Sequence, residues 1–305
     1  MGVEVTSLGP TIQDRIHYID DDVFASLGLL RGDGMARPLC EGFQLEQPDV
    51  IKMGGTVPNT AVTLAGLGHD VALMSWGEPE SLQQLRQAGI TLAEVAVDDP
   101  PHAHIVVTPD KERTMISCGD TVYSLDLAVA RTIAIQPAEL TIMDGYFLAR
   151  HDIVTQHIET AHAQGTKILL SLVNARLVKT HRDFVRHLLD SGKIDWVVGN
   201  ASEIEALHGM RWFNPYEGIL SRSDNVRYAV TIGAEGACVF DGGVSEIIPP
   251  CPVDEVIDTV GAGDAFLAGF VSGLLRGQDT FQAAGLGNET AAQAVQRAGG
   301  GVVVA

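Results

Sequence analysis

The chain has 305 residues, and 46% of them are hydrophobic, which is enough for one large α/β domain with a sizeable core. Its 20 Lys and Arg against 39 Asp and Glu give a formal net charge of −19, which argues against binding nucleic acid or an anionic membrane through a broad basic surface. Any phosphate ligand must therefore be held by a local site.

The cysteines and the N-terminus indicate a cytoplasmic protein. The four cysteines have no CxxC or zinc-like spacing, which favours reduced thiols over a disulfide framework. The N-terminus lacks the basic and apolar regions of a signal peptide, and no stretch approaches the ~18 to 20 apolar residues of a membrane span.

The first part of the chain contains a predicted hairpin. The segment "HAHIVVTPDKERTMISCGD" (residues 102–120) has two β-like runs around "PDKE", which is typical of a small antiparallel sheet. We expect a small β lid over a site, built from segments within about residues 10–50 and 98–122. The chain shows no fixed repeat or linker, so we expect a single domain, 1–305, that carries this lid as an insertion.

From residue 139 onward, short apolar runs alternate with helical patterns. The runs are bounded by turn residues and predict buried strands. They occupy residues 139–146, 166–174, 194–200, 227–236 and 236–243. Residues 152–165 and 181–192 repeat apolar side chains at helical spacing. This alternation predicts an α/β fold with a mostly parallel sheet and helices on both faces.

Late in the chain, "DTVGAGDAFLAGF" (residues 258–270) places two glycines and an acid before an apolar, helix-like run. Free N–H groups at a helix start form an anion site that needs no lysine. A carboxylate beside a bound phosphate is repelled, so we expect Asp264 to accept a proton, as general base on a substrate hydroxyl. The alternative is that Asp264 only caps a helix beginning at Ala265.

This stretch resembles the C-terminal signature of the ribokinase/PfkB family of carbohydrate and nucleoside kinases, D-T-x-G-A-G-D followed by an apolar helix. Weaker likenesses follow in the family's order along nearly the whole chain. The resemblance implies a ribokinase-like three-layer fold with a small β lid, and a kinase that uses ATP and Mg²⁺. It also implies that the backbone of Gly261, Ala262 and Gly263 stabilises the transferring group while Asp264 is the base.

By the same resemblance, the N-terminal part binds the acceptor. The segment "GPTIQDRI" implies that Asp14 binds substrate hydroxyls. The segment "GGTVPNTAVTLAGLG" implies that Gly54, Gly55 and Asn59 face the substrate. The segment "PDKERT" is similar to the family's lid segment "DGER", with Lys111 in place of the glycine.

The C-terminal part is expected to bind the nucleotide. The segment "NASEIEAL" matches an N-x-x-E element, which implies that Asn200 and Glu203 organise Mg²⁺ and the triphosphate, Glu203 through water. From the residues alone, the alternative for Glu203 is electrostatic capping of a helix start. The residues that the resemblance implies near ATP are Thr231, Gly233, Gly236 and Asn288.

Two departures from the family pattern concern the acceptor. The chain reads "VALMSWGEPESLQQLRQAGI" where the family has G-x-D-x-x-G, which indicates an altered substrate side. It reads "SLVNARL" where many sugar kinases have D-P-N-x-R, so Asn174 and Arg176 remain without the acid. The second departure resembles the adenosine-kinase-like branch, so the acceptor stays open between a sugar, at a primary alcohol, and a nucleoside. A monovalent-cation requirement stays open, and the resemblance suggests a homodimer formed through the lids.

Other functions fit the sequence less well. The glycine turn lies late and lacks G-x-G-x-x-G, and a Walker A motif is missing, which argues against Rossmann and P-loop sites. His102 and His104 have no acidic or sulfur partner at a recognisable spacing, which favours a hydrogen-bonded pair over a metal site. A non-catalytic sugar or nucleotide sensor with the same fold is the remaining alternative.

Overall fold

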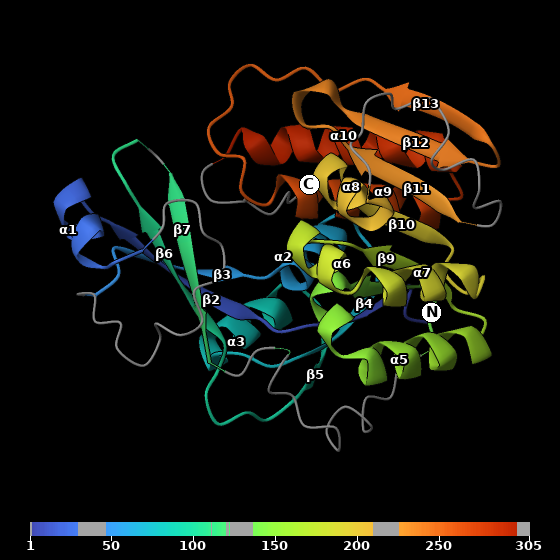
Figure 1. Cartoon of the computed structure of the whole chain (residues 1–305). Coiled ribbons are helices and arrows are strands. Elements are labelled where there is room, and N and C mark those ends of the chain that lie inside the picture. Colours follow the sequence, from blue (N-terminus) through green and yellow to red (C-terminus); the bar gives the residue numbers. More distant parts are fainter. Residues whose placement is uncertain are drawn as a thin grey trace.

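A nine-stranded sheet lies at the centre of the larger part of the protein (Figure 1). The structure is a computed structural model that describes residues 2–29, 47–110, 112–119, 122, 137–209 and 226–297. The strand order is β13-β12-β11-β10-β9-β8-β1-β4-β5. The strands are β1 Val5–Leu8, β4 Val71–Ser75, β5 Thr91–Glu94, β8 Leu140–Asp144, β9 Lys167–Ser171, β10 Trp196–Asn200, β11 Arg227–Thr231, β12 Ala237–Asp241 and β13 Val244–Ile248.

From β11 to β5 the strands of this sheet are parallel, and β12 and β13 add an antiparallel edge. The parallel strands are covered on both faces, which explains why the middle of β9, residues 168–170, is the apolar run "ILL". Ligands of such sheets bind in the crevice at the carboxyl ends of the strands. In this chain those ends are Leu8, Ser75, Glu94, Asp144, Ser171, Asn200 and Thr231.

Helices cover both faces of the sheet, and each face has its own apolar core. One face packs against α2 Thr56–Gly66, α3 Pro79–Gln87, α9 Ala262–Leu275 and α10 Thr280–Val295, and the other against α5 His151–Ala163, α6 Ala175–Thr180, α7 Arg182–Asp190 and α8 Ala201–His208. Successive residues of β10 illustrate the division, because Val197 belongs to the second core and Val198 to the first. The α/β fold predicted from the alternating pattern is confirmed.

A second, four-stranded sheet, the small sheet, stands beside the first in the order β3-β2-β6-β7 (Figure 1). Its strands are β2 Ile12–Tyr18, β3 Val50–Gly54, β6 His102–Val107 and β7 Arg113–Cys118, with the short helix α1 Asp21–Ser26 after β2. The antiparallel pair β6 and β7 confirms the predicted hairpin. The role of this sheet as a lid stays a prediction, and Lys111 lies outside the described residues.

The register of the small sheet divides its side chains between two faces. Asp14 is opposite Lys52 and Ala103, so these three side chains share one face. Arg15, one residue later, is opposite His104 on the other face. Asp14 and the histidines therefore point to opposite sides of the small sheet.

Two predictions from the sequence are wrong in detail. Cys118 is disulfide-bonded, whereas Cys238 and Cys251 are free thiols. The spacing of cysteines along the chain does not decide whether a given thiol is oxidised in the folded protein. Helix α9 begins at Ala262, not at Ala265, because Gly261 is its N-cap residue and Gly263 lies in its first turn. Within the described ranges, no helix combines the length and the apolar character that a membrane span requires.

Candidate active site

The N-terminus of α9 opens toward the crevice without a side-chain cap among the described residues. Gly261 is the N-cap residue, and its left-handed backbone, with φ of 76°, is one that glycine adopts without steric cost. The N–H groups of Ala262 and Ala265 bond to backbone carbonyls. The N–H groups of Gly263 and Asp264 are then the ones in this turn that remain for an anion.

Asp264 lies in the first turn of α9, but it does not cap that helix. Its Oδ2 accepts a hydrogen bond of 2.8 Å from Nδ2 of Asn59, and the Thr56 hydroxyl also donates to the carboxylate. Loss of water around the group raises the pKa of Asp264 to about 7, and the charges of Asp144 and Asp14 contribute to the rise. A carboxyl group with this pKa is suited to accept a proton near neutral pH.

Asp14 faces the same region from the small sheet. Its carboxylate lies against the backbone of Gly54, because a Cβ built at Gly54 would be 2.3 Å from Oδ2 of Asp14. Burial raises the pKa of Asp14 to about 7, while the nearby charges of Arg113 and Lys52 oppose the rise. The glycine predicted to face the substrate therefore makes room for the acid predicted to bind it.

Asp144 is a third acid of this region, and the sequence analysis missed it. It ends β8 and is 2% exposed, and its Oδ1 accepts a hydrogen bond from the N–H of Tyr146 at 2.8 Å. Burial raises the pKa of Asp144 to about 7. No motif marks this residue, but an acid at the carboxyl end of a predicted parallel strand was a usable signal.

Asn200 and Glu203 form a capping box at the start of α8. The Asn200 side chain accepts from the N–H of Glu203, while the Glu203 carboxylate accepts from both the N–H and Nδ2 of Asn200. Burial raises the pKa of Glu203. Glu203 therefore does cap the start of α8, as the alternative prediction had it. Its carboxylate still has lone pairs that accept no hydrogen bond from Asn200.

A cavity of about 190 Å³ joins these parts of the crevice. Its lining includes Asp264 and Gly263 from α9, Asn200 and Glu203 from α8, and Thr231 from the end of β11. The remaining lining residues are Thr56, Ser171, Val173, Val198, Gly199, Phe266 and Leu267. The structure therefore brings the glycine turn and the N-x-x-E element to one cavity.

The other residues predicted near the nucleotide are not among the lining residues of this cavity. Gly233 and Gly236 flank the turn between β11 and β12, and a Cβ at Gly236 would be 2.2 Å from the carbonyl oxygen of Ile248. The Asn288 amide donates to the carbonyl oxygens of Ile248 and Pro249. These contacts tie α10 to the sheet edge, and nucleotide contacts by these residues stay predictions.

The cavity has the donor set that a nucleotide triphosphate and a hydrated divalent cation require. The uncapped N–H groups at the start of α9 suit phosphate oxygens. The Glu203 carboxylate at the cavity wall suits a magnesium ion that keeps its waters. The residues present therefore fit the predicted ATP and Mg²⁺.

One ion pair joins the small sheet to the segment before α9. Nη2 of Arg113, in β7, donates to both oxygens of Asp258 at 3.0 and 3.1 Å. Oδ1 of Asp258 also accepts from the N–H of Val260, in the turn that leads to α9. The contact connects the sheet that carries Asp14 with the turn that carries the free N–H groups.

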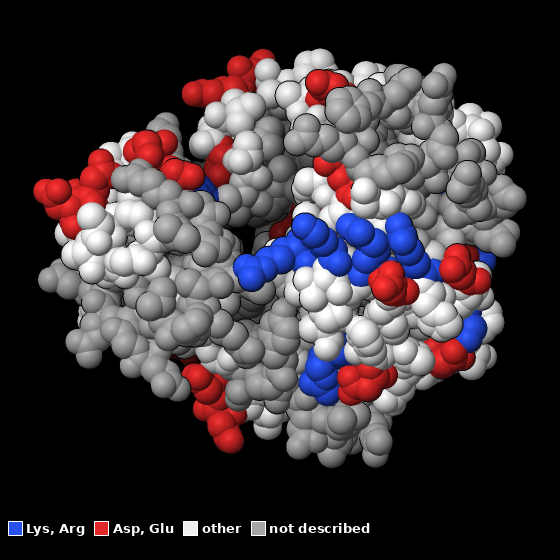
Figure 2. Space-filling model, viewed as in Figure 1, with Lys and Arg blue, Asp and Glu red and all other residues white. Residues whose placement is uncertain are grey.

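Basic side chains gather on one face of this acidic protein. Figure 2 shows a row of Lys and Arg that begins at a hollow and runs over the region of α6 and α7. These helices carry Arg176, Lys179, Arg182 and Arg186. Arg182 and Arg186 donate to carbonyl oxygens at the end of α8, and the exposed Arg176 and Lys179 form no ion pair within the described ranges.

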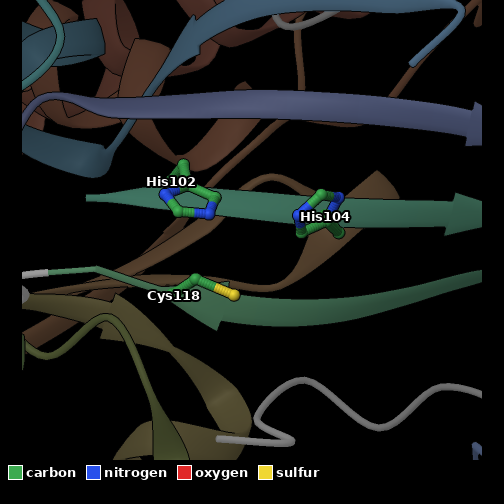
Figure 3. Close-up of side chains that lie close together, drawn as sticks. All are labelled: His102, His104 and Cys118. Carbon is green, nitrogen blue, oxygen red and sulfur yellow. The ribbon is translucent and has the colours of Figure 1, made fainter. Parts of the chain in front are cut away.

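The histidines of the small sheet form a cluster on the face opposite Asp14. Nε2 of His17 and Nδ1 of His104 are 2.9 Å apart, and His102 Nδ1 lies 3.1 Å from the carbonyl oxygen of Pro100. Figure 3 shows Cys118 beside His102 and His104, a sulfur neighbour that the sequence analysis missed. Because Cys118 is disulfide-bonded, it offers no thiolate to a metal. The hydrogen-bond partner of His102 is the carbonyl of Pro100 and that of His104 is His17, so the predicted pairing of His102 with His104 is not what these bonds show.

Comparison with known proteins adds an independent line of support. The family model described as pfkB family carbohydrate kinase matches residues 44–304. The 2-dehydro-3-deoxygluconokinase of Bacillus subtilis (strain 168) is 36% identical over 110 residues, which are 36% of this chain and only 34% of that protein. The uncharacterized sugar kinase YegV of Escherichia coli (strain K12) is 26% identical over 279 residues, 84% of this chain and 82% of that protein.

Solved structures support the fold. The crystal structure of adenosine kinase from Sinorhizobium meliloti superimposes with a TM-score of 0.79 at 24% identity and covers 98% of this chain and 96% of that chain. At this identity the similarity establishes the ribokinase-like architecture and leaves the acceptor open.

Proposed function

Because the chain belongs to the pfkB family of carbohydrate kinases, we propose that it transfers the γ-phosphoryl group of ATP to a hydroxyl of a sugar or sugar-like acceptor, a primary alcohol. The observation that carries the proposal is the position of Asp264. Its carboxylate lines the same cavity as the uncapped helix start and is held by Asn59 from α2. A proton acceptor and an anion site are thus adjacent.

In this proposal Asp264 takes the proton of the acceptor hydroxyl. The N–H groups that remain unbonded in the turn from Gly261 to Asp264 stabilise the charge on the transferring phosphoryl group. Asn59 orients the Asp264 carboxylate, and Asp14, whose carboxylate lies against Gly54, binds further acceptor hydroxyls. Asn200 and Glu203 hold a hydrated Mg²⁺, whose charge would neutralise the phosphate oxygens when bound.

The Asp264→Asn variant tests the proposal. ADP release with Mg-ATP is measured against ribose, fructose, 2-keto-3-deoxygluconate, aminosugars and nucleosides, with and without K⁺. We expect turnover that depends on the acceptor, reduced by ~10²-fold or more in the variant, with ATP binding largely retained. Unchanged turnover in the Asp264→Asn variant would contradict the assignment of Asp264 as the general base.

Two alternatives have distinct outcomes in the same screen. A nucleoside kinase keeps the mechanism and turns over nucleosides in preference to sugars. A sensor binds an acceptor or nucleotide without ATP consumption, in both the unmodified chain and the variant. The homodimer stays a prediction, which sedimentation of the purified protein tests.

A further inference from the structure

Asp144 is a buried carboxylate that the proposed reaction leaves without a role. It ends β8, between β1 and β9 near the middle of the large sheet. One oxygen is bonded to the N–H of Tyr146, and the other, Oδ2, has no hydrogen-bond partner among the described residues. Because Oδ2 accepts no hydrogen bond from those residues, it is available to accept one from a ligand hydroxyl.

The surroundings of Asp144 place it on the acceptor side of the crevice. A Cβ built at Gly9 would be 3.6 Å from Oδ2 of Asp144 and 3.1 Å from Cβ of Val57 in α2. The carboxylate therefore lies where the loop after β1 meets α2, the helix that carries Asn59. In the sheet register Asp144 is opposite Ser171, which lines the cavity with Asp264.

Acids outnumber free cations in this part of the crevice. Asp14 approaches from the small sheet, Asp264 from α9 and Asp144 from β8, and the last two interact electrostatically. Two cations act on Asp14, but Arg113 is engaged by both oxygens of Asp258, which leaves Lys52. Of the two cations that act on Asp14, Lys52 is therefore the one without an ion pair among the described residues.

We propose that Asp144 is a specificity-determining residue of the acceptor site, and that its carboxylate selects an uncharged, polyhydroxylated acceptor and rejects a sugar acid. The inference rests on the proposed function for the location of the acceptor. Hydroxyl groups donate to carboxylates, and a hydrogen bond to a charged group contributes about 1.5–3 kcal/mol. An acceptor carboxylate at the same place would be repelled by the acids. Burial is the largest cause of the raised pKa of Asp264, and the charge of Asp144 adds to it, so these two carboxyl groups lie close enough to interact.

The competing explanation is that Asp144 only caps the 3₁₀ helix Gly145–Ala149, since its side chain accepts from Tyr146. Asn is as good a cap as Asp, so Asp144→Asn keeps that role and removes the charge. Asp279, which caps α10 away from the crevice, provides the matched control Asp279→Asn. Both variants are first compared with the unmodified protein by thermal unfolding, and Asp144→Ser is a second capping variant if Asp144→Asn is unstable.

The test uses matched acceptors, D-ribose with D-ribonate and D-glucose with D-gluconate. Binding is measured by calorimetry and phosphorylation by ADP release, each at saturating Mg-ATP or ADP. We expect the unmodified protein to prefer the sugar over its acid by ~10-fold or more, and Asp144→Asn to lose most of that preference while its KM for ATP is unchanged. Asp279→Asn should keep the preference. Removing the Asp144 charge should also move the acidic limb of the rate profile to lower pH, which a cap would not do.

The outcomes separate the two proposals. An unchanged preference in Asp144→Asn, a preference for the acid in the unmodified protein, or binding of neither pair overturns the role of Asp144. Binding that follows the expected pattern without any phosphorylation supports that role and contradicts the proposed kinase activity.

Discussion

The side-chain amide of Asn59 donates a hydrogen bond of 2.8 Å to Oδ2 of Asp264 and so joins α2 to the first turn of α9. This bond stabilises the ionised carboxylate and lowers its pKa against the effect of burial. Asn59→Ala should therefore move the acidic limb of kcat to higher pH and reduce kcat at pH 7 by about 10-fold. A pH series with a saturating acceptor measures both, and an acidic limb that does not move contradicts the orienting role.

Asp264→Asn should stabilise the fold at pH 8 while it removes activity. The folded-state pKa of Asp264 is raised to about 7 from an ordinary value of 3.8, so the folded state favours the protonated form. The stabilisation of the folded state by protonated Asp264 is complete below pH 4 and is lost as the pH rises through 7. Thermal unfolding should show a Tm increase of about 2–4 °C for each kcal/mol gained at pH 8, and little change at pH 4. An equal change in Tm at pH 4 and pH 8 would show that the stabilisation does not come from the titration of Asp264.

Gly54→Ala should impair acceptor binding selectively. The new Cβ would overlap the Asp14 carboxylate, which must move. We expect the KM for the acceptor to rise by ~10-fold or more, with the KM for ATP within about 2-fold. Gly285→Ala is the matched control, because nothing lies within 4 Å of a Cβ at that helical position. Steady-state kinetics of the two variants compare them directly, and equal effects on both KM values would count against the acceptor role of Asp14.

The ion pair between Arg113 and Asp258 should affect catalysis more than stability. The Arg113 side chain is 40% exposed, and pairs of this kind contribute about 0–1 kcal/mol to folding. Because it links the small sheet to the turn before α9, Arg113→Gln should raise the KM for the acceptor. Asp258→Asn should do the same, and the double variant should be no worse than either single one. A double-mutant cycle measures this, and strictly additive effects would show that the residues act separately.

Arg176 and Lys179 should accelerate nucleotide capture. They are exposed cations beside the crevice of a protein with a net charge of −19, and a polyanion is steered by such a local field. Replacement of both by Gln should lower kcat/KM for ATP by about 3- to 10-fold at low salt and flatten its dependence on ionic strength. Lys167→Gln is the control, since Lys167 is paired with Asp195. Stopped-flow binding of a fluorescent ATP analogue provides the rate, and salt dependence equal to that of the unmodified protein would contradict steering.

The elements with a clear periodicity were predictable from the sequence. The strands at 140–144, 167–171 and 196–200 are apolar runs because both of their faces are covered, and that burial leaves a pattern in the residues. The glycine turn before α9 was predictable because few residues tolerate its backbone. In both cases a local requirement, burial on both faces or a backbone that favours glycine, restricts which residue types can occupy the position.

Relationships made only by tertiary packing were not predictable. Asp144 belongs to no motif, and its proximity to Asp264 depends on how β8 and α9 are placed. The contact between His17 and His104 depends on the register of the small sheet. The Asn288 side chain bonds to the backbone after β13, a partner that neighbouring residues do not specify.

The 205 positions that separate Asn59 from Asp264 have a consequence for biosynthesis. A ribosome makes the N-terminal half of the crevice first and the turn with the free N–H groups among the last segments. Contacts this distant in sequence form late and slowly, because a long loop must close before they contribute. A nascent chain that ends before α9 therefore lacks both the proposed base and the turn proposed to bind phosphate. Under the proposed mechanism, phosphoryl transfer cannot begin until synthesis has passed α9.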